Sequence, residues 1–594
     1  IYSIDPDGDP NSTETSISGI CRQMSSWRGV TDGVDRIAVG TSNHLYIIEN
    51  NALYDITPLR KTTSNLTNPL TTANGSTEIT VTDNGHGVKT GDFVVINSAT
   101  ATGGIPADTL YRMSGYQVTL VDANTYTIVS PTAASSTATG GGTTIDIKYL
   151  IGEAENLGIQ SSVPALGWGV GGWGLLGWNE TRTVADSTIH LENSSWSINI
   201  WDNDVIATLR NGKIYYWDTS ANQATFAVAT ELKDLSGTDG FAPRVAKKIM
   251  VSDVDRHVIA FGADAIDNLG VQDPLMIRFS SQADPTQWLP STTNTADFRR
   301  ISGGTEIVTA IQTRQETLIF TDASLHSMQF VGPPFIFSIN QVSGQTTIMG
   351  PNAATAVDGT VFWMGKENFY MYSGQVQKIP CTVRSKVFDD FNLNQSAKVT
   401  AGVNSAYNEV WWFYTSASST QNDKYVIYNY VEQVWYFGDM PRTAWIDRGV
   451  YDYPLAASID GFVYEHERQL NDGSSSPETG LNSFIESSPM DIGDGEAFTL
   501  IRKLVPDITF GGSTTTDSIV NVTLKSQNYP GGDDLETNAS AIQSTQISPV
   551  DKHTEKVDVR LRGRAFTFRY ESTDVGVKWR AGAPRVDIRT DGRR

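Results

Sequence analysis

The chain has 594 residues, enough for about three to five domains and for cores that fold without disulfide or metal staples. Charged residues make up 19% of the sequence and glycine occurs 52 times, a composition that favours short strands and turns over helical bundles. With 66 Asp and Glu against 44 Lys and Arg, the net charge is −22. Tight electrostatic binding of nucleic acid or of an anionic membrane surface is therefore not expected.

The two ends of the chain differ in charge. Residues 551–594 hold 12 Lys and Arg against 7 Asp and Glu, a net of +5, which leaves −27 on residues 1–550. We expect this basic tail to be a solvated or subunit-contacting strand face, with a DNA-binding patch as the alternative. The two cysteines, Cys21 and Cys381, cannot build a disulfide framework.

Two segments bear on targeting. The N-terminus, IYSIDPDGDP, has neither the basic nor the apolar region of a signal peptide. Because it begins without Met, we expect the encoded protein to start upstream or to be processed. Residues 156–179 are uncharged and near the length of a membrane-spanning helix, but glycine at the density found there weakens a helix. The sequence predicts an irregular Gly/Trp loop at 156–179 and no membrane contact.

The dominant pattern along the chain is a strand, a short turn and then a strand rich in aromatic residues. It begins in an N-terminal meander within residues 1–61 and recurs after residue 196. The predicted strand groups span residues 36–56, 196–218, 306–330, 352–379, 398–437 and 454–466.

Asn-Gly and Asp-Gly pairs at residues 211–212, 358–359 and 460–461 predict type I′ hairpin turns, which need positive φ at both central residues. Antiparallel units repeated every ~40–60 residues indicate a β-propeller. We predict a propeller body over residues 149–470, joined by the meander of residues 1–61. A string of separate β-sandwiches is the alternative.

Two regions break this pattern. Residues 62–148 are poor in aromatics and rich in Thr, Ser and Gly, which predicts a small inserted β domain that folds on its own and projects from the body. Residues 471–594 contain further strands and predict a C-terminal β-sandwich or platform domain with a basic tail. The predicted fold class is therefore mainly β, with a propeller-like body, an inserted β domain and a C-terminal β domain.

The sequence lacks the common local motifs of catalysis and of cofactor binding. Its seven histidines are at least 42 residues apart, which excludes a local metal motif. It has neither a Walker-type phosphate loop nor a Gly-x-Ser-x-Gly elbow. The acidic run Asp5, Asp7 and Asp9 departs from a calcium loop in the place of its glycine. We predict no catalytic, cofactor-binding or metal-binding residues and no enzyme activity, although a carboxylate pair assembled by the fold stays open.

Two aromatic features have both a functional and a structural interpretation. Trp168, Trp173 and Trp178 are spaced by five residues among glycines and are able to stack on sugars or bases; we expect a core or inter-subunit plug instead. Residues 281–288, SQADPTQW, are weakly similar to the Asp-box turns of sialidase propellers. There we expect a plain turn with Trp288 packed beneath it.

Six stretches of sequence carry a resemblance to a known family. They are GGWGLLGWNE (171–180), DPLMIRFSSQADPTQW (273–288), AIQTRQETLIFTDASLHSMQFVGPPF (310–335), GTVFWMGKENFYMYSGQVQKIPCTVRSKVFDD (359–390), NEVWWFYTSASSTQNDKYVIYNYVEQVWYFG (408–438) and the closing residues 556–594. They resemble virion structural proteins of tailed bacteriophages, most of all the tail tubular or nozzle proteins of short-tailed phages. The inserted region 62–148 resembles a small β domain found in phage structural proteins.

The resemblance implies a ring, usually a homo-hexamer, below a dodecameric head–tail adaptor ring and in contact with tail fibres or tailspikes. It implies a tail nozzle or tube of the virion, made in the host cytoplasm, that retains packaged double-stranded DNA and conducts it during ejection without tight binding. A hexamer would carry 6 × −22 = −132, and negative walls repel phosphates over about 8 Å at physiological salt. The alternatives are a tail adhesin, a glycan-binding or glycan-degrading tail protein, or a protein that docks tail fibres.

Overall fold

The computed structural model describes residues 17–112, 114–152, 193–222, 227–473, 477–491, 495–528 and 542–592. The chain divides into two compact units, Tyr2–Glu465 and His466–Arg594. In the described ranges the helical elements are all short: α1 (Ala107–Leu110), α2 (Thr219–Asn222), α3 (Arg384–Phe388) and the 3₁₀ turns η2 (Leu232–Asp234) and η3 (Leu393–Lys398). No helix in those ranges is long and apolar enough to cross a membrane. The chain is mainly β, which confirms the predicted fold class.

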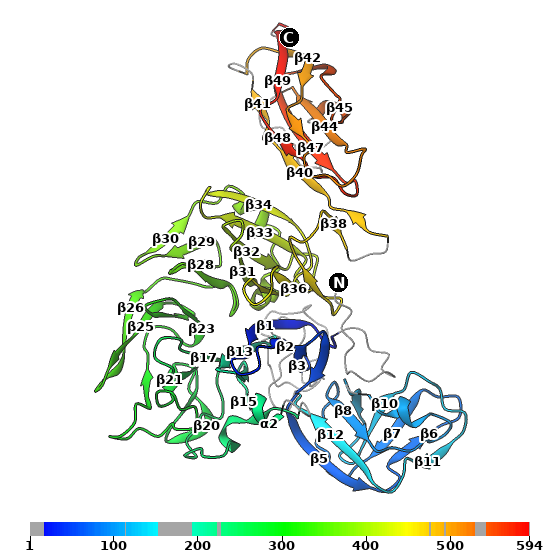
Figure 1. Ribbon diagram of the computed structural model, residues 1–594, viewed down its shortest axis with the longest axis vertical. Coiled ribbons are helices and arrows are strands. Elements are labelled where there is room, and N and C mark those ends of the chain that lie inside the picture. Colours follow the sequence, from blue (N-terminus) through cyan, green and yellow to red (C-terminus); the bar gives the residue numbers. More distant parts are fainter. Residues whose placement is uncertain are drawn as a thin grey trace, which may run out of the picture. The chain divides into compact units, whose positions relative to one another are not determined.

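Seven antiparallel sheets follow one another in the described part of residues 21–465 as the blades of a propeller (Figure 1). Blades 1 to 3 are β1 (Cys21–Arg28), β2 (Asp35–Thr41), β3 (Leu45–Glu49) and β4 (Ala52–Asp55); β13 (Trp196–Trp201), β14 (Asp204–Leu209), β15 (Ile214–Trp217) and β16 (Thr230–Glu231); and β17 (Lys248–Val251), β18 (Val258–Phe261), β21 (Met276–Phe279) and β22 (Asp297–Arg300). Blade 3 also carries a hairpin of β19 (Asp264–Ala265) and β20 (Asn268–Gln272).

The later blades repeat the same order, and the last has three strands. Blades 4 to 7 are β23 (Ile307–Gln312), β24 (Thr317–Thr321), β25 (Leu325–Gly332) and β26 (Ile336–Ser343); β27 (Ala354–Val357), β28 (Thr360–Met364), β29 (Phe369–Tyr372) and β30 (Val376–Ile379); β31 (Thr400–Asn404), β32 (Glu409–Tyr414), β33 (Lys424–Asn429) and β34 (Val434–Asp439); and β35 (Ala444–Ile446), β36 (Leu455–Ala457) and β37 (Val463–Glu465).

The first strand of each blade lies beside the first strand of the next, in the cycle β1, β13, β17, β23, β27, β31, β35 and back to β1. These strands therefore form the inner wall of the propeller. The ring closes between blades 7 and 1 through packing of Met24 and Ile37 with Leu455. The backbone N–H of Ile17 also donates to the carbonyl of Gly461 at 2.8 Å. In the described residues no strand is exchanged across this junction.

Packing between blades explains the sequence pattern of the middle strands. A middle strand is covered on both faces, so it is apolar throughout instead of alternating; β3 (LYIIE) and β24 (TLIFT) are buried at every position. Each junction has its own apolar cluster, and between blades 3 and 4 it includes Phe261, Phe279 and Ile319, all with 0% exposure. Burial of each such side chain contributes about 1.5–3 kcal/mol. The junction clusters hold the ring together.

The three predicted hairpin turns form, but only one of them is of the predicted type I′. At residues 358–359 both central residues have positive φ, 48° and 87°, as a type I′ turn requires. At the other two predicted sites only one central residue, Asn211 or Gly461, has a positive φ, so the type I′ prediction is wrong there. Asn50 and Asn51, between β3 and β4, have φ of 51° and 65°, because Asn tolerates the left-handed region that this turn needs.

The inserted domain is a curled eight-stranded sheet between blades 1 and 2 in sequence, in the order β11-β6-β7-β10-β9-β8-β12-β5. Its strands are β5 (Leu59–Leu66), β6 (Leu70–Thr72), β7 (Glu78–Thr82), β8 (Phe93–Asn97), β9 (Tyr116–Leu120), β10 (Thr125–Val129), β11 (Ala138–Gly140) and β12 (Ile145–Leu150). It has its own core, with Ile79, Val94 and Ile147 fully buried. The predicted boundary at residue 62 cuts β5, which pairs with β12 along its length; the domain starts at Leu59.

The second unit is a β-sandwich. One sheet has the order β40-β47-β44-β45, with β41 also on β47, and the other has the order β46-β42-β49. The strands are β38 (Asn471–Asp472), β39 (Thr479–Gly480), β40 (Ser483–Glu486), β41 (Met490–Asp491), β42 (Thr499–Val505), β43 (Ile508–Thr509), β44 (Val520–Gln527), β45 (Ile542–Val550), β46 (Val557–Gly563), β47 (Ala565–Ser572), β48 (Arg580–Ala581) and β49 (Arg585–Thr590). Ile501, Leu524 and Phe566 lie in the core between the sheets. The unit begins at His466, five residues before the predicted boundary.

Candidate functional site

The axial channel of the propeller is the candidate site, because its two ends have opposite character. Each blade begins with its first strand and follows the same up-and-down order. A parallel bridge between Asn352, just before β27, and Thr400, in β31, shows that two of these first strands run in the same direction. They therefore all begin at one end of the channel, here called the start end, and all terminate at the other, the finish end.

Side chains satisfy the inner edges of the first strands. The Gln23 amide donates to the carbonyl of Ile198 at 3.3 Å and accepts from its N–H at 3.1 Å. Ser197 makes the same reciprocal pair with Ile249, at 2.8 and 3.2 Å. An unpaired buried backbone group is costly. These side chains pair the backbone N–H and C=O groups that face the axis at the inner edge of each sheet.

The start end is closed by hydrogen bonds between blades that are not neighbours. Nη1 of Arg22, on blade 1, donates to Oε1 of Gln421, on blade 6, at 3.1 Å. Nδ2 of Asn352, beside blade 5, donates to the carbonyl of Arg22 at 3.3 Å. Nη1 of Arg210, on blade 2, donates to the carbonyl of Val308, on blade 4, at 2.8 Å. A hollow of about 10 Å³ beside these contacts has room for about one water molecule.

Basic side chains gather at the closed end. Nζ of Lys248 donates to Oγ1 of Thr309 at 2.9 Å, and Nζ of Lys398 donates to the carbonyl of Thr420. Burial, and then the charge of Arg210, lower the pKa of Lys248 to about 8. Burial, and then the charge of Arg22, lower the pKa of Lys398 to about 7. Because burial disfavours the charged form, a larger fraction of these two lysines is neutral near pH 7 than in an exposed lysine.

The finish end holds a cavity of about 510 Å³ beside blades 5 to 7. It is bounded by the ends of β27, β31 and β35 and by the turns that follow them. Its lining residues are Thr355, Ala356, Val357, Asp358, Ala401, Gly402, Val403, Ser405, Asn408, Tyr430, Trp445 and Asp447.

Two carboxylates and a phenol give this cavity its polar character. The carboxylate of Asp447 accepts from the backbone N–H of Ser405 at 3.2 Å. Asp358 is 81% exposed and lies 3.3 Å from Arg314. The hydroxyl of Tyr430 donates to Oδ1 of Asn408 at 3.3 Å. Burial, and then the charges of the two aspartates, raise the pKa of Tyr430, which therefore stays a hydrogen-bond donor at neutral pH. Such a set of groups suits a ligand rich in hydroxyls.

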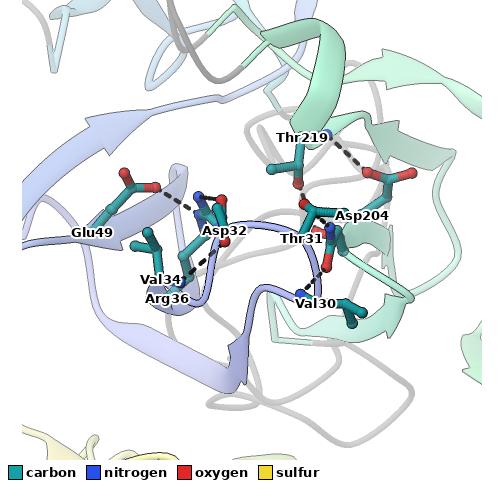
Figure 2. A network of polar contacts seen from close by, with 9 residues as sticks. Val30, Thr31, Asp32, Val34, Arg36, Glu49, Asp204 and Thr219 are labelled. Carbon is teal, nitrogen blue, oxygen red and sulfur yellow. Dashed lines mark hydrogen bonds and ion pairs between the residues drawn. The ribbon is translucent and has the colours of Figure 1, made fainter.

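The turns that end the first strands also fasten neighbouring blades. The backbone N–H of Val30, on blade 1, donates to Oδ1 of Asn203, on blade 2, at 2.7 Å. Nδ2 of Asn203 donates to Oγ1 of Thr31 at 3.0 Å. Behind this turn, Arg36 is fully buried and lies 2.6 Å from both Asp32 and Glu49 (Figure 2). These contacts fix the finish end of the first two blades.

Blades 2 and 3 are joined at the same end by an ion pair. Nη2 of Arg256 donates to both carboxylate oxygens of Asp202, at 2.8 and 2.7 Å. The guanidinium also lies over the ring of Trp201, 5.3 Å from its centroid. Both charged side chains are about half exposed, so we expect at most about 1 kcal/mol from the pair and assign it to positioning of the turns.

A carboxylate–imidazole–hydroxyl chain lies in blade 3 that the sequence analysis missed. Nδ1 of His257 is 3.1 Å from Asp255, and its Nε2 is 3.0 Å from Oγ1 of Thr295. That hydroxyl accepts from the N–H of Gln282 at 2.7 Å, while Ser252 donates to the other oxygen of Asp255. Asp255 and His257 are buried. These hydrogen bonds fix the turn after β21. In the sequence, only the Asp-x-His spacing of Asp255 and His257 hints at them.

The features singled out in the sequence are not brought together. Asp5, Asp7 and Asp9, the tryptophans at 168, 173 and 178, and the loop 156–179 lie outside the described residues. In the 281–288 turn, Trp288 is 1% exposed and donates to the carbonyl of Pro285 at 2.7 Å, as expected for a ring packed beneath a turn. Across the described residues, no three His, Cys, Asp or Glu side chains form a group that is able to hold a metal ion.

No family model matches the chain, and no curated protein matches its sequence. Solved structures similar to it include the phage phi92 endosialidase (12% identity, 84% of this chain and 71% of that one, TM-score 0.21). Two others are the AfRom2 CNH domain (9%, 49% and 87%, TM-score 0.27) and an exo-β-1,3-galactanase from Phanerochaete chrysosporium (10%, 66% and 95%, TM-score 0.18). At these identities and TM-scores the likenesses assign no activity or substrate to the chain.

The comparisons correct one prediction. Two of the three similar structures are named as enzymes, an endosialidase and a galactanase, so the prediction of no enzyme activity, which was drawn from missing sequence motifs, is corrected.

Proposed function

We propose that the chain is a structural subunit of the tail of a short-tailed bacteriophage, and that copies of it form a ring-shaped nozzle. The observation that carries this proposal is where the family resemblance falls. Residues 359–390 contain β28 to β30 and α3, residues 408–438 contain β32, β33 and all but the last residue of β34, and residues 556–594 contain β46 to β49. The resemblance thus follows the strands that build blades 5 and 6 and the C-terminal sandwich, and is not confined to isolated loops.

Contacts at the start end bear on where DNA would travel in this proposal. Residues of blades that are not neighbours meet there, such as Asn352 beside blade 5 and Arg22 of blade 1, so we do not propose a path for a duplex through a single subunit. In this proposal the conduit is the hole at the centre of a ring of copies, and each propeller is part of its wall. A head-to-tail contact that closes after one full turn leaves such a hole.

The charge of the chain suits a conduit that does not hold its cargo. At −22 per subunit, the walls repel phosphates within about one Debye length, ~8 Å at physiological salt. We propose that the ring, most simply a homo-hexamer, retains packaged double-stranded DNA and releases it without tight binding. Its partners would be the head–tail adaptor ring and tail fibres or tailspikes, and its place the tail of the virion.

The test is the symmetry and the DNA affinity of the purified chain. Cryo-EM of assembled particles should show a closed ring, sixfold in the simplest case, with an axial hole. Titration with duplex DNA at low and moderate salt should show weak binding, because counterion release needs a coherent basic tract. Trimers without an axial hole, or tight binding that falls steeply with salt, would contradict the nozzle.

The finish-end cavity favours a second candidate function, binding or cleavage of a host glycan. A cavity of about 510 Å³ that contains Asp358, Asp447 and Tyr430 has the groups that acid–base hydrolysis of a glycosidic bond uses. Release of reducing sugar from host polysaccharide, lost in Asp358→Asn and kept in the exposed control Asp452→Asn, would support it. No release and no binding of that polysaccharide by the unmodified chain would exclude it.

A further inference from the structure

One face of the C-terminal sandwich concentrates the basic residues of the chain. The register of the sheet β46-β42-β49 places Arg562 and Arg589 on either side of Leu500 and places Asp558 and Asp587 on either side of Lys503. A bulge between Ile501 and Lys503 adds Arg502. The cations on the outward face, here called the arginine face, are Arg502, Lys503, Arg560, Arg562, Arg585 and Arg589, against two aspartates, Asp558 and Asp587.

Most of these cations are unpaired. Arg562 lies 2.6 Å from Asp591, and Asp558 lies 3.9 Å from Lys556. Among the described residues, the other five cations of the arginine face take part in no ion pair within 4 Å. Like charges on one face repel one another within about one Debye length, ~8 Å at physiological salt. The face therefore gains stability when an anionic surface covers it.

The edge of this sheet is uncovered as well. β49 pairs only with β42, and its exposure pattern leaves no residue buried. Ile588 is opposite the fully buried Ile501 yet is 41% exposed, so apolar surface continues to the open edge. Such an edge offers unpaired backbone groups to another chain. An occupant that fits here is acidic and brings a protein surface with it.

We propose that the arginine face docks on the acidic propeller unit of a second copy of this chain, an inference that rests on the ring in the proposed function. Residues 1–465 hold 28 Lys and Arg against 47 Asp and Glu, a net of −19. A basic face on one unit and an acidic surface on the other make a head-to-tail contact, the type that closes into rings. Charge complementarity then sets the orientation and speeds the encounter of copies.

Duplex DNA is the competing occupant, and the charges of this unit favour it less. Residues 466–594 carry 16 Lys and Arg against 19 Asp and Glu, a net of −3. Two aspartates stand within the face itself. Carboxylates within the face repel the phosphates of a duplex and oppose the neutralisation that drives DNA binding, whereas a protein surface can match each charge and cover Ile588 at the edge.

The experiment compares two charge-reversed variants of the full chain. One carries Arg560→Glu, Arg585→Glu and Arg589→Glu, all exposed and unpaired side chains. The control carries Lys552→Glu, Lys578→Glu and Arg580→Glu, exposed residues of the same unit outside the arginine face, and changes the net charge equally. Circular dichroism and thermal unfolding first establish that both variants fold as the unmodified chain does.

Mass photometry and sedimentation then follow assembly. We expect the arginine-face variant to need roughly tenfold or more higher concentration for half-assembly, while the control assembles as the unmodified chain does. Full assembly of the arginine-face variant overturns the docking alone, and a monomeric unmodified chain overturns both the docking and the ring. A 30-bp duplex is the second probe. Salt-sensitive DNA binding that only the arginine-face variant loses, with assembly intact, assigns the face to nucleic acid and overturns the proposal.

Discussion

The indole of Trp445, on the first strand of blade 7, lies directly over Gly402, on the first strand of blade 6. A Cβ on Gly402 would come within 2.4 Å of Cδ1 of that indole, and Nε1 of Trp445 donates to the carbonyl of Val403 at 2.7 Å. Trp196 lies over Gly40 in the same way between blades 1 and 2. At both junctions a glycine makes room for a tryptophan that ties two blades together.

Gly402→Ala should destabilise the propeller. The added methyl group forces the indole or the strand to shift, and overpacking of this kind costs about 1–3 kcal/mol. Thermal or denaturant unfolding measures the effect. Gly449→Ala is the matched control, because its Cβ would meet nothing within 4 Å. Equal stability of the two variants would show that the close approach of Trp445 to Gly402 does not constrain the fold.

Arg278→Met should destabilise blade 3 strongly. Arg278 and Asp264 lie 3.1 Å apart and are 1% and 0% exposed, so removal of the guanidinium leaves a buried carboxylate without its partner. Loss of one member of a buried pair costs about 3–5 kcal/mol. Arg300→Met breaks an ion pair of the same blade that is 56% exposed on its arginine side and should cost at most about 1 kcal/mol. A smaller loss for Arg278→Met than for Arg300→Met in urea unfolding would refute this ranking.

The buried lysines of the start end predict a rise in stability with pH. The folded pKa is lowered to about 7 for Lys398 and to about 8 for Lys248, against about 10.4 for an unfolded lysine. Between pH 7 and 10 the unfolded chain therefore binds more protons than the folded chain, so the free energy of unfolding increases as pH rises. The increase between pH 7 and 9 should be smaller in Lys398→Met and unchanged in the exposed control Lys366→Met. Identical pH profiles would argue against desolvation of Lys398.

Deletion of the inserted domain should leave a folded propeller. The domain has a core of its own, and its ends are close together, because β5 and β12 pair from Leu59 with Leu150 to Leu66 with Ile145. Replacement of residues 59–150 by a short Gly/Ser linker should give a soluble chain that unfolds cooperatively. A modest loss of stability is expected because the deletion removes Ser114, whose carbonyl lies 2.8 Å from Nε2 of His44 in blade 1. Aggregation of the deletion variant would show that the propeller depends on the insert.

The strands rich in aromatics were predictable because period and turn signals are local. β28 and β32, with their Asp-Gly or Asn neighbours and bulky residues, stand out in the sequence. Blade 3 was missed, since runs of four apolar residues such as β18 have too little length to show a period. β1 was missed because CRQMSSWR alternates only in part.

The site was not predictable, for a different reason. The contacts that close the start end join residues far apart in the chain; Arg22 and Gln421 are separated by 399 positions. Closure of the ring brings blades 1 and 6 close together, and neither local sequence contains a pattern that predicts the contact between Arg22 and Gln421. Likewise, Thr295 and His257 meet across 38 residues. Polar side chains that serve such contacts look like ordinary surface residues until the fold is known.

The junction between blades 7 and 1 sets where the ring would break under load. Every other pair of neighbouring blades is continuous along the chain, whereas this pair is held by side-chain packing and a few hydrogen bonds. A pull applied between Ile17 and Glu465, the ends of the described propeller, would load that seam directly. The propeller would then open first between blades 7 and 1, and its blades would unfold in turn from the two ends.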